Sequence, residues 1–328
     1  MSLISILKYC VFTAIAIGLV YLVFKDVDLQ AFWGDIANMN VWWVLLSLCF
    51  AFFGYVSRML RWVLLIEPLG YFPSKKNSFF ALMFGYFANL ALPRIGEVAR
   101  CGVLHTKEKI PVDKLIGTVI IERACDLLML ALLGLSVVFL KFDLFGPFLY
   151  EHVLVAVMQL LHKIPVFYIV LFFMLVLIGI VFLRVSKNLF MVSKKILEFI
   201  RGIIEGLRSV YTMKKRWKFL FHTVFIWLMY WAMTYVVFFA IPSTSKLDMV
   251  DGLFILIVGG LGMSAPVQSG IGVYHYIVAQ ALVLYGLDFS SEGLLFATIG
   301  HGSQTVFVVI FGLIAVWFFA KKKKKYEV

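Results

Sequence analysis

Charged side chains are scarce in this chain of 328 residues. Only 15% of its residues are Asp, Glu, Lys or Arg, whereas 63% are hydrophobic, and the mean hydropathy is +0.99. A soluble domain needs polar faces on its helices, and stretches such as 41–54 and 165–183 have almost none. Several apolar runs exceed the ~20 residues that an α-helix needs to cross a ~30 Å hydrocarbon core. The composition therefore excludes a soluble globular protein and predicts an integral membrane protein.

Cysteine is also rare, and common enzyme and ATPase motifs are missing. The four cysteines lie in or beside apolar segments without CxxC spacing, which indicates neither a disulfide framework nor a metal site. The sequence contains no HExxH, GxSxG or Walker A motif. We therefore expect no metal, no cofactor, no catalytic site and no use of ATP by this chain itself.

Six apolar segments are long enough to be full transmembrane helices. They are 4–24, 41–66, 113–140, 165–186, 217–241 and 293–320. The first is expected to be a retained helix rather than a cleaved signal peptide, because no small-x-small site precedes Lys25. If the N-terminus is cytoplasmic, most basic residues fall in cytoplasmic loops, including the 184–218 cluster, Arg58 and Arg61. This positive-inside pattern predicts a multi-pass protein of a cell membrane, such as a bacterial inner membrane, with both termini cytoplasmic.

Two further apolar segments, 79–105 and 250–286, are interrupted in their middle by Pro, Gly and polar residues. Backbone at membrane depth must be hydrogen-bonded within the protein or to water, so a broken segment must be buried in the bundle or line a cavity. The charge pattern holds only if 79–105 returns to the cytoplasm and 250–286 returns outside. We therefore predict an all-α polytopic membrane protein with about six full transmembrane helices and two oppositely entering re-entrant helical hairpins. The hairpin tips, near Leu92–Gly96 and Ser264–Gly270, are expected to meet, and such paired breaks indicate a transport site.

The segment 187–213 predicts an amphipathic helix on the cytoplasmic side. Its apolar residues recur at helical spacing, and Lys, Arg and Glu take the other face. We expect it to lie on the inner leaflet, and packing against a soluble partner is the alternative. The net charge of +12 follows from this topology, so it indicates no nucleic-acid partner. Residues 1–328 are thus predicted to form a single integral membrane domain.

Charged residues gather at the first break and in the transmembrane segment that follows. They are Arg94, Glu97, Arg100, Glu122, Arg123 and Asp126, with Asn89 nearby. Each Arg or acid at mid-helix depth costs about 2.5–3.5 kcal/mol, so we expect these charges to pair. The i,i+3 pairs on one helical face are Arg94–Glu97, Glu97–Arg100 and Arg123–Asp126.

Three interpretations of this cluster stay open. In the first, it is an internal ion network that joins the first hairpin to the helix 113–140. In the second, Arg94 and Arg100 donate hydrogen bonds to a phosphate or another anion at the hairpin tip, which suits the planar guanidinium fork. In the third, the acids form a proton pathway.

Three ordered motifs carry a family resemblance. The strings LPRIGEVAR (92–100), IERACDLL (121–128) and SAPVQSGIGVYH (264–275) resemble the pattern of the lysylphosphatidylglycerol synthase transmembrane, or flippase-like, family. The resemblance covers most of the chain and implies that family's membrane region without the soluble aminoacyl-transferase domain of its full-length synthases. It implies that the lipid path is lined by Arg94, Gly96, Glu97, Arg100, Glu122, Arg123, Asp126, Pro266, Gly270 and Gly272. A glutamate often follows the late Gly-x-Gly in that family, and His275 stands near that place here.

The second break adds further candidate binding residues, Ser264, Gln268 and His275. Its glycines favour either close helix approach or a surface that lines the substrate. His275 and His301 lie on separate apolar segments, and a lone intramembrane His is more often a hydrogen-bonded packing residue than a ligand.

We therefore expect a flippase-like protein that translocates an anionic phospholipid or a lipid-linked headgroup between leaflets through a polar midplane site. Transport would be downhill, or coupled to protons or to the membrane potential. A second class is a membrane enzyme that acts on lipid headgroups, with Glu97, Glu122 or His275 as acid or base. A third class is a non-catalytic scaffold that docks a soluble transferase through 187–218. Membrane lipids are the expected partners, and the sequence leaves a homo-oligomer open.

Overall fold

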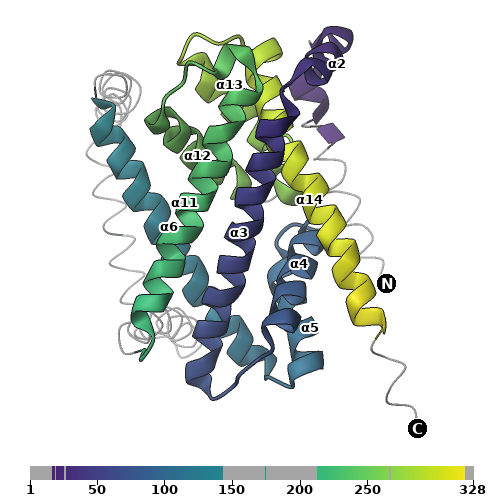
Figure 1. Cartoon of the computed structure of the whole chain (residues 1–328), viewed down its shortest axis with the longest axis vertical. Helices are drawn as coiled ribbons and strands as arrows, with labels where there is room; N and C mark the ends of the chain where they lie inside the picture. Colours follow the sequence, from purple (N-terminus) through teal and green to yellow (C-terminus); the bar gives the residue numbers. More distant parts are fainter. Residues whose placement is uncertain are drawn as a thin grey trace.

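The computed structural model describes residues 17–18, 20–25, 27–142, 174, 213–265 and 267–321. Within these ranges every regular element is a helix and no strand is present (Figure 1). The predicted segments 4–24, 165–186 and 187–213 lie largely or almost wholly outside the described residues. The other predicted spans and, apart from Pro266, both hairpins lie inside them.

Four of the described helices are long and apolar enough to cross a membrane. They are α3 (Val41–Ile66), α6 (Val112–Leu140), α11 (Arg216–Val237) and α14 (Leu294–Lys321). Short 3₁₀ turns extend α3 by η1 (Glu67–Leu69) and α11 by η3 (Phe238–Ala240). Each helix coincides with a predicted span to within a few residues, so the all-α polytopic membrane fold is confirmed.

Helices α3 and α11 form the central pair of the bundle and pack along their lengths (Figure 1). Helix α3 begins after the N-cap Asn40, whose side chain accepts the Trp42 N–H at 3.2 Å. Its small polar residues find partners on α11, as when Ser47 Oγ donates to the Met233 carbonyl at 2.8 Å. An apolar run that satisfies its few polar groups in this way can stay helical at membrane depth.

The first predicted hairpin consists of α4 (Lys75–Ala91) and α5 (Ile95–Glu108). Between them, Leu92 is extended, with φ −140° and ψ 135°. This is the conformation that a following proline favours, and Pro93 also has no N–H to continue the helix. The break therefore ends one helix and starts the next in a three-residue turn.

The two arms of this hairpin touch through glycine. A Cβ added at Gly96 would lie 1.9 Å from the carbonyl oxygen of Gly85, so the backbones are in direct contact there. The Asn89 side chain closes the turn by accepting the Gly96 N–H at 2.7 Å. Gly96 thus has a packing role in the described structure.

The second predicted hairpin consists of α12 (Met249–Met263) and α13 (Val273–Val283), with the 3₁₀ turn η5 (Gln268–Gly270) at its tip. Helix α12 starts with a capping box, in which Asp248 and Asp251 each accept a backbone N–H from the other. The helix then runs through its glycines without interruption, and the chain breaks only after Met263.

The hairpins occupy opposite ends of the bundle, α4 and α5 in its lower half and α12 and α13 in its upper half (Figure 1). Their tips are in contact. Arg94 Nη2 donates to the Ser264 carbonyl at 2.6 Å, and Gln268 Nε2 donates to the Ala91 carbonyl at 3.1 Å. The predicted meeting of the two tips is therefore confirmed.

The main apolar core lies in the upper half, where α11, α13 and α14 pack around fully buried Phe238, Leu282 and Phe296. Helix α2 (Leu29–Asn38) covers this core through Phe32. The remaining short elements are the 3₁₀ turn η4 (Pro242–Thr244) and the short π-helix η6 (Phe289–Gly293), which leads into α14.

Candidate functional site

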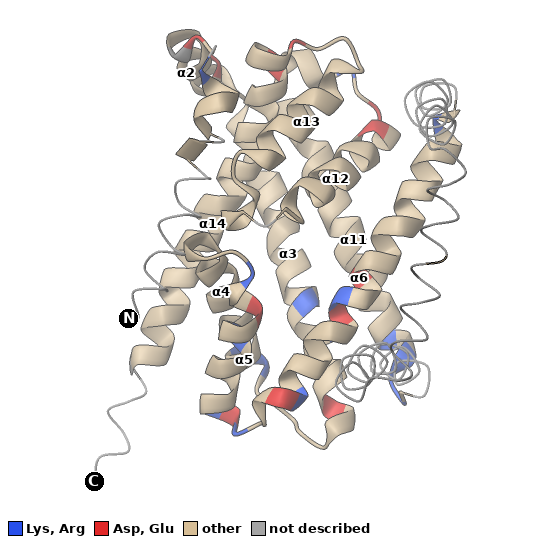
Figure 2. Cartoon of the chain, turned by 180° about the vertical axis from the view of Figure 1, so that it is seen from behind, with Lys and Arg blue, Asp and Glu red and all other residues tan. Residues whose placement is uncertain are grey.

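Charged residues of α3, α5 and α6 lie in the lower half of the bundle (Figure 2), and their side chains form ion pairs with one another. Glu122 is fully buried and lies at the centre of this cluster. It accepts from Arg58 Nη2 at 2.6 Å through Oε1 and from Arg100 Nη2 at 2.9 Å through Oε2. Asp126, one turn further along α6, accepts from Arg61 at 2.7 Å and from Arg58 at 3.3 Å. Three helices are thereby joined by ion pairs.

Arg58 and Arg61 are the residues that the sequence analysis placed wrongly. They were assigned to a cytoplasmic loop, but they are 5% and 0% exposed. Helix α3 continues to Ile66, and a spacing of three residues puts both guanidinium groups on the face that meets α6. The available signal was two arginines inside a long apolar run, where an unpaired charge is costly.

Two predicted pairings are also wrong. Glu97 pairs with neither Arg94 nor Arg100 but with Arg123 of α6, with its Oε1 2.7 Å from Nε. Arg94 precedes α5 in the left-handed conformation, at φ 59°, so its side chain does not share the helical face of Glu97. The predicted Arg123–Asp126 pair is present, at 4.0 Å.

The buried guanidinium groups have more donors than the described partners use. The buried N–H groups that donate to no acceptor among the described residues are Arg58 Nε, Arg61 Nε and Nη1, and Arg100 Nε and Nη1. The flat face of Arg100 is covered by Trp62, whose ring centroid lies 4.5 Å from the guanidinium carbon. The Trp62 N–H is itself fixed by Thr118 at 2.9 Å. Stacking on Trp62 therefore holds the Arg100 guanidinium group in place, and it leaves the N–H groups in the plane of that group free of the ring.

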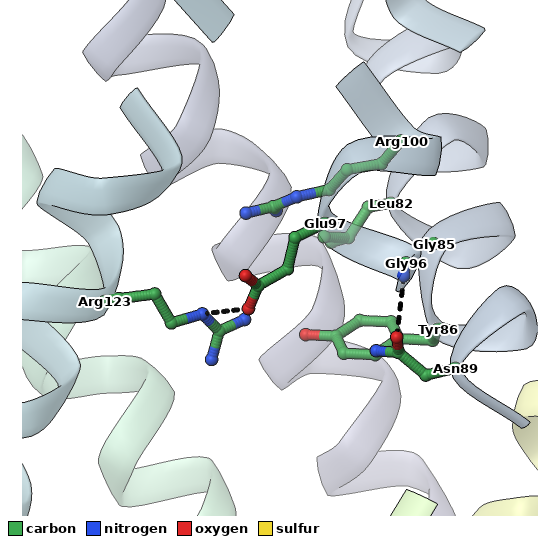
Figure 3. A pocket seen from close by; sticks show the side chains of 8 residues that line it. All are labelled: Leu82, Gly85, Tyr86, Asn89, Gly96, Glu97, Arg100 and Arg123. Atoms are coloured by element: carbon green, nitrogen blue, oxygen red, sulfur yellow. Dashed lines mark hydrogen bonds and ion pairs between the residues drawn. The ribbon is translucent and has the colours of Figure 1, made fainter. Parts of the chain in front are cut away.

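Arg100 also lines a small pocket that is partly open to the surroundings. The pocket is lined by Leu82, Gly85, Tyr86, Asn89, Gly96, Glu97, Arg100 and Arg123. Figure 3 shows that Glu97 and Arg100 from α5 and Tyr86 from α4 extend from one side, and that Arg123 from α6 extends from the other side to meet Glu97. The pocket thus joins the buried cluster to the exposed side of the first hairpin.

The second hairpin contributes to the tip contact and not to the charged cluster. Gln268 is buried, whereas Ser264 is exposed and offers its carbonyl to Arg94. Gly270 and Gly272 have φ of +75° and +83°, values that L side chains rarely adopt, so they shape the turn. Pro266 lies outside the described residues.

A separate polar group surrounds His275 and His301, whose ring centroids lie 5.1 Å apart between α13 and α14. His301 Nε2 contacts the Ser269 carbonyl at 3.0 Å, and Tyr274 packs on the His301 ring at 4.9 Å. Sequence spacing did not predict this contact because it joins two helices. Within the described residues no group of three or more His, Cys, Asp or Glu side chains is placed to hold a metal ion.

The family model described as Lysylphosphatidylglycerol synthase TM region matches residues 9–312. The chain belongs to this family. The UPF0104 membrane protein MJ1595 of Methanocaldococcus jannaschii is 24% identical over an alignment of 263 positions, and the match covers 70% of this chain and 74% of that protein. No solved structure matches.

As a member of the lysylphosphatidylglycerol synthase transmembrane-region family, the chain is a multi-pass protein of a lipid-related membrane family. The three motifs that resemble this family lie at the two hairpin tips and in the helices that carry the charged cluster. LPRIGEVAR forms the first tip and the start of α5, IERACDLL lies within α6, and SAPVQSGIGVYH forms the second tip and the start of α13. In this chain the charged and glycine-rich motifs thus lie within one helical bundle.

Proposed function

We propose that this protein is a flippase-like carrier, which moves an anionic phospholipid or a lipid-linked headgroup between the two leaflets. Both termini would be cytoplasmic, in a cell membrane. The observation that carries the proposal is the contact of two broken hairpins from opposite ends of the bundle, directly beside a buried cluster of arginines and carboxylates. A polar interior site between two such elements is the arrangement that alternating access needs.

The tip contact suits a gate because it is polar and local. Each of its two hydrogen bonds joins a side chain of one hairpin to a backbone carbonyl of the other. Such bonds contribute roughly 0.5–1.5 kcal/mol each when neutral and about 1.5–3 kcal/mol when one partner is charged. Opening them would therefore cost little enough for a passing anionic headgroup to compete for Arg94.

The direct test is lipid translocation by the purified full-length chain in phospholipid vesicles. A fluorescent phosphatidylglycerol in the inner leaflet should become accessible to an impermeant quencher, at a rate above that of protein-free vesicles. A rate equal to that of protein-free vesicles would contradict the proposal, and conversion of the headgroup would indicate an enzyme instead.

A cross-link between the two hairpin tips tests whether their contact acts as a gate. In a chain without its native cysteines, Ala91→Cys and Gln268→Cys joined by a short bifunctional reagent should stop translocation, because the tips can no longer separate. The matched control joins Glu67→Cys to Lys215→Cys, whose native side chains form a 2.7 Å ion pair between the ends of α3 and α11. That cross-link should leave translocation unchanged, and equal effects of both cross-links would contradict a gate at the tips.

A further inference from the structure

Two buried histidines lie apart from the charged cluster and have no role in it. His275 of α13 and His301 of α14 are 8% and 7% exposed, and their ring centroids lie 5.1 Å apart. His301 Nε2 lies 3.0 Å from the Ser269 carbonyl oxygen, which can only accept, so this nitrogen carries a hydrogen. His275 Nδ1 is buried and has no partner among the described residues. The pair therefore has unused capacity to bind a proton.

The contact of His301 reaches the second hairpin tip directly. Ser269 is the middle residue of η5, and its φ of 50° lies in the left-handed region that residues other than glycine seldom adopt. Its neighbour Gln268 donates to the Ala91 carbonyl of the first hairpin. Adjacent residues of η5 are thus held from two sides, by α14 through His301 and by the first hairpin through Gln268. A change at His301 can therefore act on the contact between the tips.

Within the described part of the chain, no counter-charge accompanies the histidine pair. Phe24 packs beside His275 at 6.0 Å between ring centroids, and Tyr274 packs on His301 at 4.9 Å. Neither histidine has a carboxylate at ion-pair distance among the described residues. The other titratable or charged groups on the elements around the pair include Tyr276 on α13, Asp251 on α12, Asp288 and Glu292 on η6, Lys25 before α2, Arg94 at the first tip, and Tyr55, Arg58, Tyr86 and Tyr230 on the helices that also pack on α14.

A charge on either ring is unfavourable while the tips are in contact. A buried cation without a carboxylate loses its hydration, and a stronger hydrogen bond to one carbonyl compensates only part of that loss. Two charges at this separation would also repel each other, so the pair can hold one proton at most. His301 is the better place for it, because His275 lies in the first turn of α13, where the helix dipole disfavours a cation. Separation of the tips would admit water and remove the penalty.

We infer that His301 is the proton-binding site of the carrier, and that it takes up one proton when the two hairpin tips separate. A ligand that binds the open arrangement better than the closed one shifts the population toward the open one. At neutral pH both arrangements are uncharged at this site, and as the pH falls toward the ordinary value for histidine, about 6.5, only the open arrangement gains a proton. Acid therefore favours opening. The inference rests on the proposed carrier function and names the ion that regulates its gate.

The first test measures lipid translocation at two pH values in vesicles with the same buffer on both sides. The probe is fluorescent phosphatidylglycerol with a fluorophore that does not respond to pH. After subtraction of the protein-free rate, translocation should be at least about fivefold faster at pH 5.5 than at pH 7.5, the lower end of typical couplings between two sites. Equal rates at the two pH values would overturn the inference.

Variants assign the pH response to one residue. His301→Gln keeps an N–H donor for the Ser269 carbonyl but cannot bind the proton, so its rates at the two pH values should be equal. The matched control is His105→Gln, which removes a histidine at the opposite end of α5 from the tips and should keep the full response. A response in His301→Gln as large as that of the wild-type protein would overturn the inference.

The second test detects the coupling without translocation. In a chain without its native cysteines, Ala91→Cys and Gln268→Cys are joined by the short cross-linker, and NMR of ¹⁵N-labelled histidine follows the charge on His301 before and after cross-linking. The cross-linked protein should need at least about fivefold more protons in solution to charge His301, because its tips cannot separate. The signal is identified by its loss in His301→Gln or by its change in His275→Gln, so either variant suffices if the other does not fold. Equal titrations would overturn the inference.

The two tests separate this inference from the carrier function. Coupling in the NMR titration without translocation at either pH would keep the proton site at the tips and reject the carrier. Translocation at the same rate at both pH values would keep the carrier and reject the proton site.

Discussion

At the scale of single residues, Glu122 is the acid on which the cluster depends. It is fully buried and pairs with Arg58, Arg61 and Arg100, whereas Glu97 is 36% exposed and, among the residues that the structure describes, pairs with Arg123 alone. The sequence analysis made Glu97 the shared partner of two arginines, because it could use only spacing along one helix. In the structure, Glu122 is the acid that several arginines share.

This difference predicts unequal effects of two chemically identical substitutions. Glu122→Gln should lower the free energy of unfolding by about 3–5 kcal/mol, because it leaves buried arginines without their carboxylate. Glu97→Gln should cost no more than about 1 kcal/mol, as is typical of exposed ion pairs. Thermal unfolding of the two variants in the same detergent measures the contrast. Equal losses would show that the charges are not arranged as described.

At the scale of elements, the first hairpin depends on contact between backbones. Gly96→Ala places a methyl group against the Gly85 carbonyl and should separate α4 from α5, with loss of folded protein. Gly102 lies in the same helix with no atom within 4 Å of an added Cβ. Gly102→Ala should therefore stabilise α5 by up to about 1 kcal/mol through helix propensity. Yield of monodisperse protein and its unfolding temperature test both, and a tolerated Gly96→Ala would contradict the close contact.

The elements themselves were predictable from the sequence, and most of their contacts were not. The length of apolar runs predicted α3 and α6, and Pro93 predicted the break between α4 and α5, because both signals are local. The pairing of Arg58 with Glu122 joins residues far apart in the chain, and no periodicity reports it. The meeting of the tips was an exception, since the need to bury broken backbone leaves few other partners.

At the scale of the whole molecule, the two ends of the bundle differ in charge. Lys75 begins α4, and Lys107 and Lys109 lie at the end of α5. Asp28 and Asp248 are the N-caps of α2 and α12, which lie in the opposite half of the bundle (Figure 2). This agrees with the predicted orientation, in which the basic end is cytoplasmic.

Orientation can be tested by labelling single cysteines in a chain without its native ones. Ser245→Cys, in an exposed turn after α11, should react with an impermeant reagent in intact cells. Lys109→Cys, in the exposed turn between α5 and α6, should react only after the membrane is permeabilised. The reverse pattern would invert the topology, and equal labelling would contradict a single orientation.

The contact between the tips has a consequence for how this protein tolerates change. Both acceptors are main-chain oxygens, at Ala91 and Ser264, which every amino acid supplies. Both donors are side chains, those of Arg94 and Gln268. Natural selection can therefore conserve the two donor side chains, Arg94 and Gln268, while the side chains at the acceptor positions change. Saturation mutagenesis should show that Ala91 and Ser264 tolerate more substitutions than Arg94 and Gln268 do. Two surfaces that recognise each other in this way need not evolve as matched pairs, and covariation between them would be weak even though they touch.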